Sequence, residues 1–92
     1  MTSYASVERI EGKYVECELE LIPINKSKPE NFSSKKTREI TILLGKVKSV
    51  VGEISEGDIL VVKHFCGECI SVCKKDDAEK RRRIDVLNRI MS

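Results

Sequence analysis

The chain has 92 residues, of which 40% are hydrophobic and 35% charged, and its net charge is +2. A chain of this length makes a single domain, residues 1–92, with a modest core, and its near-neutral charge implies no strongly electrostatic partner. The composition excludes a collagen-like chain and a wholly disordered one, and the longest apolar run, residues 59–62, is far too short for a membrane helix.

The first residues contain no basic segment followed by an apolar run, so the sequence predicts no signal peptide. We therefore expect a cytoplasmic protein with no membrane partner. In a reducing cytosol the four cysteines, at positions 17, 66, 69 and 73, are expected to be free thiols or metal ligands rather than disulfides.

The first strong pattern is the strict alternation of apolar and polar residues over 14–22, which predicts a half-buried strand. A short strand over 7–10 is expected before it, joined by a turn at Gly12-Lys13. Residues 23–38 contain both prolines and many Ser, Asn and Lys residues, which is typical of a flexible loop. Residues 23–50 carry seven basic and two acidic residues, so the basic excess of the chain lies in and just after this loop.

A second alternating stretch, residues 38–44, predicts another strand, and residues 47–54 are expected to form a connecting turn or a short bent strand around Gly52. Strands over 59–65 and 70–73 follow. The fold class predicted from these elements is mostly β (α+β). It is a small antiparallel β-barrel or rolled sheet of about five strands with one C-terminal α-helix.

That helix is predicted over residues 77–91. Asp76 can accept hydrogen bonds from the free backbone N–H groups at its beginning, and Glu79 follows three residues later. Its second half carries an apolar stripe at helical spacing, made of Ile84, Leu87 and Met91 with Val86 and Ile90 beside them. We expect it to pack on an open side or end of the sheet.

The cysteines at 66 and 69 are predicted to flank a tight turn at Gly67-Glu68. In that register Cys66 faces Cys69, Phe65 faces Ile70, Lys63 faces Val72 and Val62 faces Cys73. One face of the hairpin then carries the set His64, Cys66, Cys69 and Cys73. Thiolates and an imidazole are zinc ligands, so a zinc site is one hypothesis.

The geometry of a flat strand argues against zinc, because Cys69 and Cys73 would lie about 13 Å apart. The main expectation is therefore no cofactor. As alternatives to zinc, Cys66 and Cys69 are ordinary residues beside a turn or a pair that oxidises reversibly, and Cys17 and Cys73 pack as small buried hydrophobic residues.

Two basic segments are candidates for nucleic-acid binding. Lys80-Arg81-Arg82-Arg83 is interpreted as a solvated face that pairs with its own acids, through Glu79–Arg83 and Asp85–Arg89 at i,i+4 spacing. The loop charge is uncompensated, so the candidate binding residues are Lys26, Lys28, Lys35, Lys36 and Arg38. Only four aromatic residues are available for base stacking, which disfavours a nucleic-acid partner.

Three short motifs occur in order along the chain: VERIEG at 7–12, EGDIL at 56–60 and DAEKRRRI at 77–84. Together they resemble the domain-of-unknown-function family numbered three thousand and six, a family of small bacterial proteins, over residues 6–22 and 39–90. The resemblance implies a small β-barrel with a helix and brings no catalytic residues with it. The basic loop resembles an insertion, and the cysteine hairpin lies outside the family pattern.

No spacing indicates a catalytic constellation, so the sequence predicts that the protein is not an enzyme. The leading hypothesis is a non-catalytic binding or accessory domain that acts through contacts with an unknown protein partner. The alternatives are a thiolate metal-binding or redox-responsive module at the cysteine hairpin, and a weak nucleic-acid binder through the basic loop.

Overall fold

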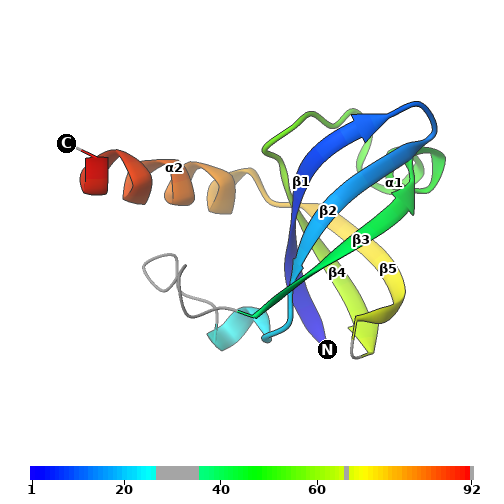
Figure 1. The fold of residues 1–92 in the computed structure, drawn as a ribbon, viewed down its shortest axis with the longest axis horizontal. Helices are drawn as coiled ribbons and strands as arrows, with labels where there is room; N and C mark the ends of the chain where they lie inside the picture. The colour runs from blue at the N-terminus through cyan, green and yellow to red at the C-terminus, as the bar shows by residue number, and fades with distance from the viewer. Residues whose placement is uncertain (27–35, 66, 92) are drawn as a thin grey trace.

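The computed structural model describes residues 1–26, 36–65 and 67–91. An antiparallel sheet in the order β3-β2-β1-β4-β5 curls into a half-barrel, and a C-terminal helix follows it (Figure 1). The predicted fold class is thus confirmed. The strands are β1 (Thr2–Glu11), β2 (Tyr14–Glu20), β3 (Thr37–Leu43), β4 (Ile59–Phe65) and β5 (Glu68–Lys75), and the helices are η1 (Ile24–Lys26), α1 (Leu44–Val51) and α2 (Asp77–Met91).

The core lies inside the curl of the sheet, where alternate residues of the strands meet. The strand predicted from alternation is β2, whose Val15, Cys17 and Leu19 are buried. The strand predicted over 7–10 is longer, because β1 is paired along its length with β2 on one side and β4 on the other. Its pairing with β4 runs from Thr2 to Ser6, a stretch that the sequence pattern left unassigned.

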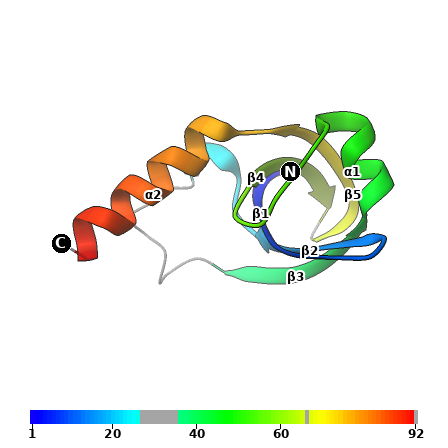
Figure 2. The same ribbon diagram turned by 90° about the horizontal axis from the view of Figure 1, so that it is seen from above.

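The prediction of a turn or bent strand over 47–54 is wrong, since residues 44–51 form α1. Leu44, Val47 and Val51 recur at helical spacing, and Val47 is wholly buried in the core. The helix packs against both edge strands, β3 and β5, and so covers the open side of the half-barrel (Figure 2). It ends at Gly52, whose φ of 80° suits a glycine.

The hairpin register predicted around Gly67-Glu68 is also wrong. Glu68 is the first residue of β5 and pairs with Phe65, while Lys63 pairs with Ser71 and Val62 with Val72. The strands carry two irregularities, and Cys69 adopts a φ of 54° that is uncommon outside glycine. These irregularities break the simple alternation on which the predicted common face of His64 and the cysteines depended.

The range 23–38 predicted for the basic loop includes residues of two regular elements. Residues 24–26 form η1, and Thr37 and Arg38 already belong to β3. Residues 27–35 lie outside the described part of the chain.

Candidate functional site

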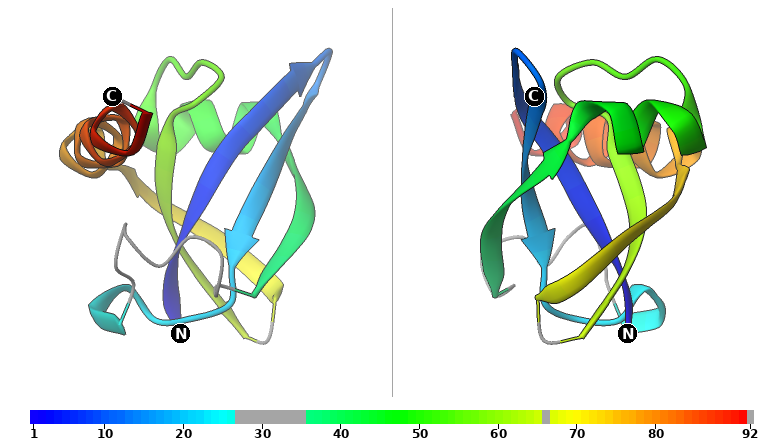
Figure 3. Two further views of the ribbon diagram at one scale, coloured as in Figure 1. Left: turned by 60° about the vertical axis from the view of Figure 1, so that its left-hand side comes forward. Right: turned by 90° about the vertical axis from the view of Figure 1, so that its right-hand side faces the viewer.

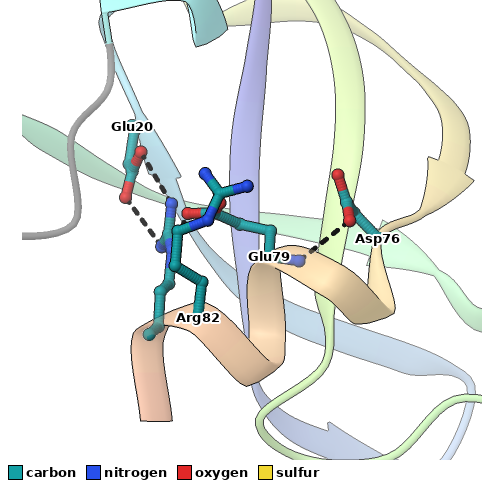
Figure 4. A network of polar contacts seen from close by, with 5 residues as sticks. Glu20, Asp76, Glu79 and Arg82 are labelled. Atoms are coloured by element: carbon teal, nitrogen blue, oxygen red, sulfur yellow. Dashed lines mark hydrogen bonds and ion pairs between the residues drawn. The ribbon is translucent and has the colours of Figure 1, made fainter. Parts of the chain in front are cut away.

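The first turn of α2 is fixed to the sheet by its cap. The Asp76 carboxylate accepts a hydrogen bond from the Glu79 amide at 2.9 Å, as the sequence predicted (Figure 4). The Asp76 amide donates in turn to the Ile59 carbonyl at 2.8 Å, at the beginning of β4. The point at which the helix leaves the sheet is therefore held by backbone as well as side-chain hydrogen bonds.

Behind the cap lies a buried ionic cluster that joins α2 to β2. The Arg83 guanidinium donates from Nε to Glu79 at 2.8 Å, and its two terminal nitrogens contact the two Glu20 oxygens at 2.9 and 3.2 Å. It also lies over the Tyr4 ring, 5.0 Å from the centroid. Arg82 forms an ion pair with Glu79 from the solvent side (Figure 4). We call Glu20, Glu79, Arg83 and Tyr4 the anchor cluster.

The Arg83 guanidinium keeps its charge although it is buried. Burial opposes the charged guanidinium, but its hydrogen bonds to Glu79 and Glu20 outweigh that effect and raise the pKa of Arg83. Burial and the nearby Glu79 carboxylate raise the pKa of Tyr4. The pair Glu79–Arg83 was predicted from i,i+4 spacing, but as part of a solvated face; its burial against Glu20 is a correction.

A second ion pair ties α2 to the turn before β4. Lys80 contacts the buried Asp58 carboxylate at 2.7 Å, and the same carboxylate accepts a hydrogen bond from the Ser55 amide at 2.8 Å. Burial opposes charge on Asp58, yet these hydrogen bonds prevail and hold the pKa of the carboxyl below its ordinary value. The first two turns of α2 are thus attached mainly by polar contacts.

Beyond Arg83 the helix runs away from the sheet (Figure 1). Four of its five apolar side chains there are exposed, and Val86 is half-buried. The exposed fractions are 46% for Ile84, 47% for Leu87, 68% for Ile90 and 81% for Met91. Ile84, Leu87 and Met91 follow one another at steps of three and four residues along one side of the helix, as the sequence predicted, and Ile90, predicted beside them, lies three residues after Leu87. We call these four residues the α2 stripe. The helix was expected to pack on an open side or end of the sheet. Its first two turns are attached to the sheet by the polar contacts described above, whereas the stripe is exposed.

The residues predicted as metal ligands are not gathered in the described part of the chain. His64 is buried, whereas Cys69 and Cys73 are exposed on β5, and Cys66 lies outside the described residues. Among residues 1–26, 36–65 and 67–91 no group of three or more His, Cys, Asp or Glu residues is placed to hold a metal ion. Cys17 is buried as expected, which raises the pKa of its thiol to about 11, whereas the prediction that Cys73 is buried is wrong.

Both ring nitrogens of His64 take part in a buried chain of hydrogen bonds. The Gly67 amide donates to Nδ1 at 3.0 Å, and Nε2 lies 2.9 Å from the Ser3 hydroxyl, which itself donates to the Ile22 carbonyl at 2.7 Å. This pattern assigns the hydrogen of the neutral ring to Nε2. Burial and the nearby N-terminal ammonium group lower the pKa of His64, so the ring stays neutral and has a structural role.

The residues predicted for nucleic-acid binding are only partly described. Lys36 and Arg38 are exposed, Lys26 belongs to η1, and Lys28 and Lys35 lie outside the described residues. The Arg38 side chain reaches the β4–β5 hairpin, where a Cβ added to Gly67 would lie 2.9 Å from its guanidinium. It therefore extends across the open side of the half-barrel.

Comparison of the chain with protein-family models, curated proteins and solved structures finds no match. The resemblance to an uncharacterised bacterial family accordingly stays a prediction. None of the helices within the described ranges is long and apolar enough to cross a membrane. Sequence reasoning missed the contacts of Glu20 with Arg83 and of Asp58 with Lys80, since neither partner is near the other in the chain.

Proposed function

We propose that the chain is a non-catalytic protein-interaction domain whose α2 stripe inserts into an apolar groove of a partner protein. The observation that carries this proposal is the exposure of four large apolar side chains on one side of a firmly attached helix. Contiguous apolar surface of this kind marks sites of interaction in soluble proteins.

The spacing of the stripe suits a groove. Ile84, Leu87 and Met91 stand at positions i, i+3 and i+7, the pattern by which an amphipathic helix enters a groove on its partner. A stable interface between two flat surfaces needs roughly 800 Å² from each partner, more than four side chains on one helix provide. A groove surrounds each side chain and so buries more area from the same residues.

The charge around the stripe defines the rim of that groove. From Arg81 onward, α2 exposes three arginines, Arg81, Arg82 and Arg89, against one exposed acid, Asp85. Complementary potentials direct encounter and suppress wrong partners, so the partner groove is expected to carry carboxylates at its edge.

The test compares the full chain with two single variants, Leu87→Glu and its matched control Asn88→Glu. Both add one negative charge to neighbouring exposed positions of α2, but only the first lies in the stripe. Affinity capture from an extract of the source cells, followed by titration of the purified partner, should give a protein bound by wild type and Asn88→Glu. Its affinity for Leu87→Glu should be at least about tenfold lower.

Two results would contradict the proposal. One is a set of captured proteins that does not differ between the two variants. The other is a dimer in sedimentation equilibrium that Leu87→Glu dissociates and Asn88→Glu does not, since the stripe would then be covered by a second copy. Circular dichroism of all three proteins checks that α2 is intact.

The alternatives from the sequence have separate tests. Stoichiometric zinc in protein purified without a metal column, lost on Cys69→Ser, would support a thiolate site. Nucleic-acid binding through Lys36 and Arg38 would weaken steeply with salt, because phosphate contacts release counterions.

A further inference from the structure

A second surface, separate from the α2 stripe, lies at the end of the half-barrel that carries the β1–β2 turn and α1 (Figure 3). The two segments are joined by a hydrogen bond from the Leu44 amide to the Lys13 carbonyl at 2.7 Å. Between them is an open hollow of about 400 Å³. Its lining includes Lys13, Leu43, Leu44, Gly45, Lys46 and Lys48.

The floor of the hollow is apolar. Leu43 is the last residue of β3, and 44% of it is exposed. Its cross-strand partner Tyr14 is 53% exposed and stands on the same side of the sheet, which extends the apolar surface. An exposed leucine beside an exposed tyrosine is the kind of surface that protein interfaces use.

The rim of the hollow is cationic and largely uncompensated. Lys13 and Lys46 are exposed, and neither forms an ion pair with a carboxylate in the described part of the chain. Lys48 has one acidic neighbour, Glu53, at 3.5 Å. Three lysines therefore line the hollow, and among them Lys48 alone pairs with an acid in the described part of the chain.

We propose that this hollow binds a short acidic peptide segment of a partner protein. One large aliphatic side chain of the segment enters against Leu43 and Leu44, and the carboxylates beside it contact Lys13 and Lys46. Charge complementarity selects this occupant, because an apolar hollow lined by lysines attracts an aliphatic residue flanked by acids. A second copy of the chain fits poorly, because its own α2 stripe is flanked by arginines, which the lysines repel.

The probe is a fluorescein-labelled, C-terminally amidated peptide with the sequence Glu-Asp-Leu-Glu-Asp, titrated with the full chain by fluorescence polarisation. We expect saturable binding at protein concentrations up to about 1 mM, which is the range of weak peptide recognition. The affinity should fall by about tenfold or more when Leu is replaced by Ser in the peptide, and when the chain carries Lys13→Glu with Lys46→Glu.

The matched control carries Lys36→Glu with Lys63→Glu. It makes the same change in net charge at exposed lysines of the opposite end of the sheet, where Lys63 pairs with Thr2. Peptide binding by this control should stay within about twofold of wild type at physiological salt, where charges farther apart than a Debye length are screened. Leu87→Glu should also leave peptide binding unchanged, which separates this site from the α2 stripe.

The proposal is overturned if the peptide does not bind, if both double variants weaken it equally, or if the serine peptide binds as tightly as the leucine peptide. A result with decanoate would also overturn it. If decanoate displaces the peptide, and if Lys13→Glu with Lys46→Glu does not weaken peptide binding, the hollow is a site for a free amphiphile.

Discussion

Replacing Arg83 by methionine tests the idea that a buried ionic cluster attaches α2. The change keeps an unbranched side chain, shorter than that of arginine, and removes the cation that lies between the Glu20 and Glu79 carboxylates, both of which are buried. It also removes the cation over the Tyr4 ring. Breaking a buried pair by removing one partner leaves an uncompensated charge and costs about 3–5 kcal/mol. That is a large share of the roughly 5–15 kcal/mol that stabilises a domain of ordinary size.

The measurement is urea unfolding followed by circular dichroism, together with hydrogen exchange of the α2 amides. We expect Arg83→Met to lower the free energy of unfolding by several kcal/mol, or to lose protection first in α2 if the helix detaches before the sheet unfolds. The control is Arg9→Met. Arg9 lies 2.6 Å from Glu16, but the two side chains are 55% and 41% exposed, so solvent screens this pair and its loss should change stability little.

If both arginine variants cost the same small amount, the reasoning that burial gives the Arg83 cluster its importance is refuted. A third variant separates charge from packing. With Glu20→Leu and Glu79→Met added to Arg83→Met, no buried charge is left unpaired, and most of the lost stability should return.

The remaining predictions concern three buried titratable groups. The folded state lowers the pKa of His64 below its ordinary value of 6.5, so the free energy of unfolding should fall as the pH falls below about 6.5. Urea titrations at several pH values should show a weaker pH dependence of this free energy for His64→Gln. The pKa of Asp58 is likewise lowered from 3.8, so the stabilisation by its carboxylate is present above that pH and lost in acid. Asp58→Asn should lower the free energy of unfolding by about 1–3 kcal/mol at neutral pH and make it less sensitive to acid below about pH 4. Cys17, with a pKa of about 11, should resist iodoacetamide at about pH 8 while Cys69 and Cys73 react, as peptide mass spectrometry would show; equal alkylation of all three in the folded protein would contradict its burial.

The parts of the fold that sequence reasoning found are those with a local physical signal. The alternation over 14–22 predicted β2 because successive side chains of a strand point to opposite faces. The helix over 77–91 was predicted from its cap and its stripe, and the Asp76 hydrogen bond to the Glu79 amide confirms the cap. Both signals are complete within a few neighbouring residues.

The parts that were missed depend on contacts between distant residues. Val47, Val50 and Val51 are β-branched and favour strands locally, but a helix buries Val47 and covers the space between β3 and β5, so tertiary packing overrides propensity. The hairpin register failed because strand irregularities have no reliable local signal.

In the candidate site, too, the sequence predicted what neighbouring residues determine and missed what distant residues determine. The α2 stripe is visible in the sequence because its residues are neighbours on one helix. The anchor cluster is not visible, since Glu20 and Arg83 are 63 positions apart. The pairs Glu79–Arg83 and Asp85–Arg89 both satisfy the i,i+4 rule, so the sequence does not tell which of them is buried. The Ser3–His64 hydrogen bond, across 61 positions, is equally invisible and explains why a lone histidine looked like a ligand.

The division of α2 into a polar and an apolar half connects its attachment to its proposed use. Had Ile84 and Leu87 packed on the sheet, the helix would have been attached by the same residues that a partner needs. Instead Glu79, Lys80 and Arg83 make the attachment within the first two turns, through ion pairs whose partners Glu20 and Asp58 are buried and fixed. Directional contacts of this kind set the angle at which the helix leaves the sheet. The anchor cluster therefore holds the stripe in one orientation. In the proposed interaction the ordering of the helix would be complete before binding, which lowers the entropic cost.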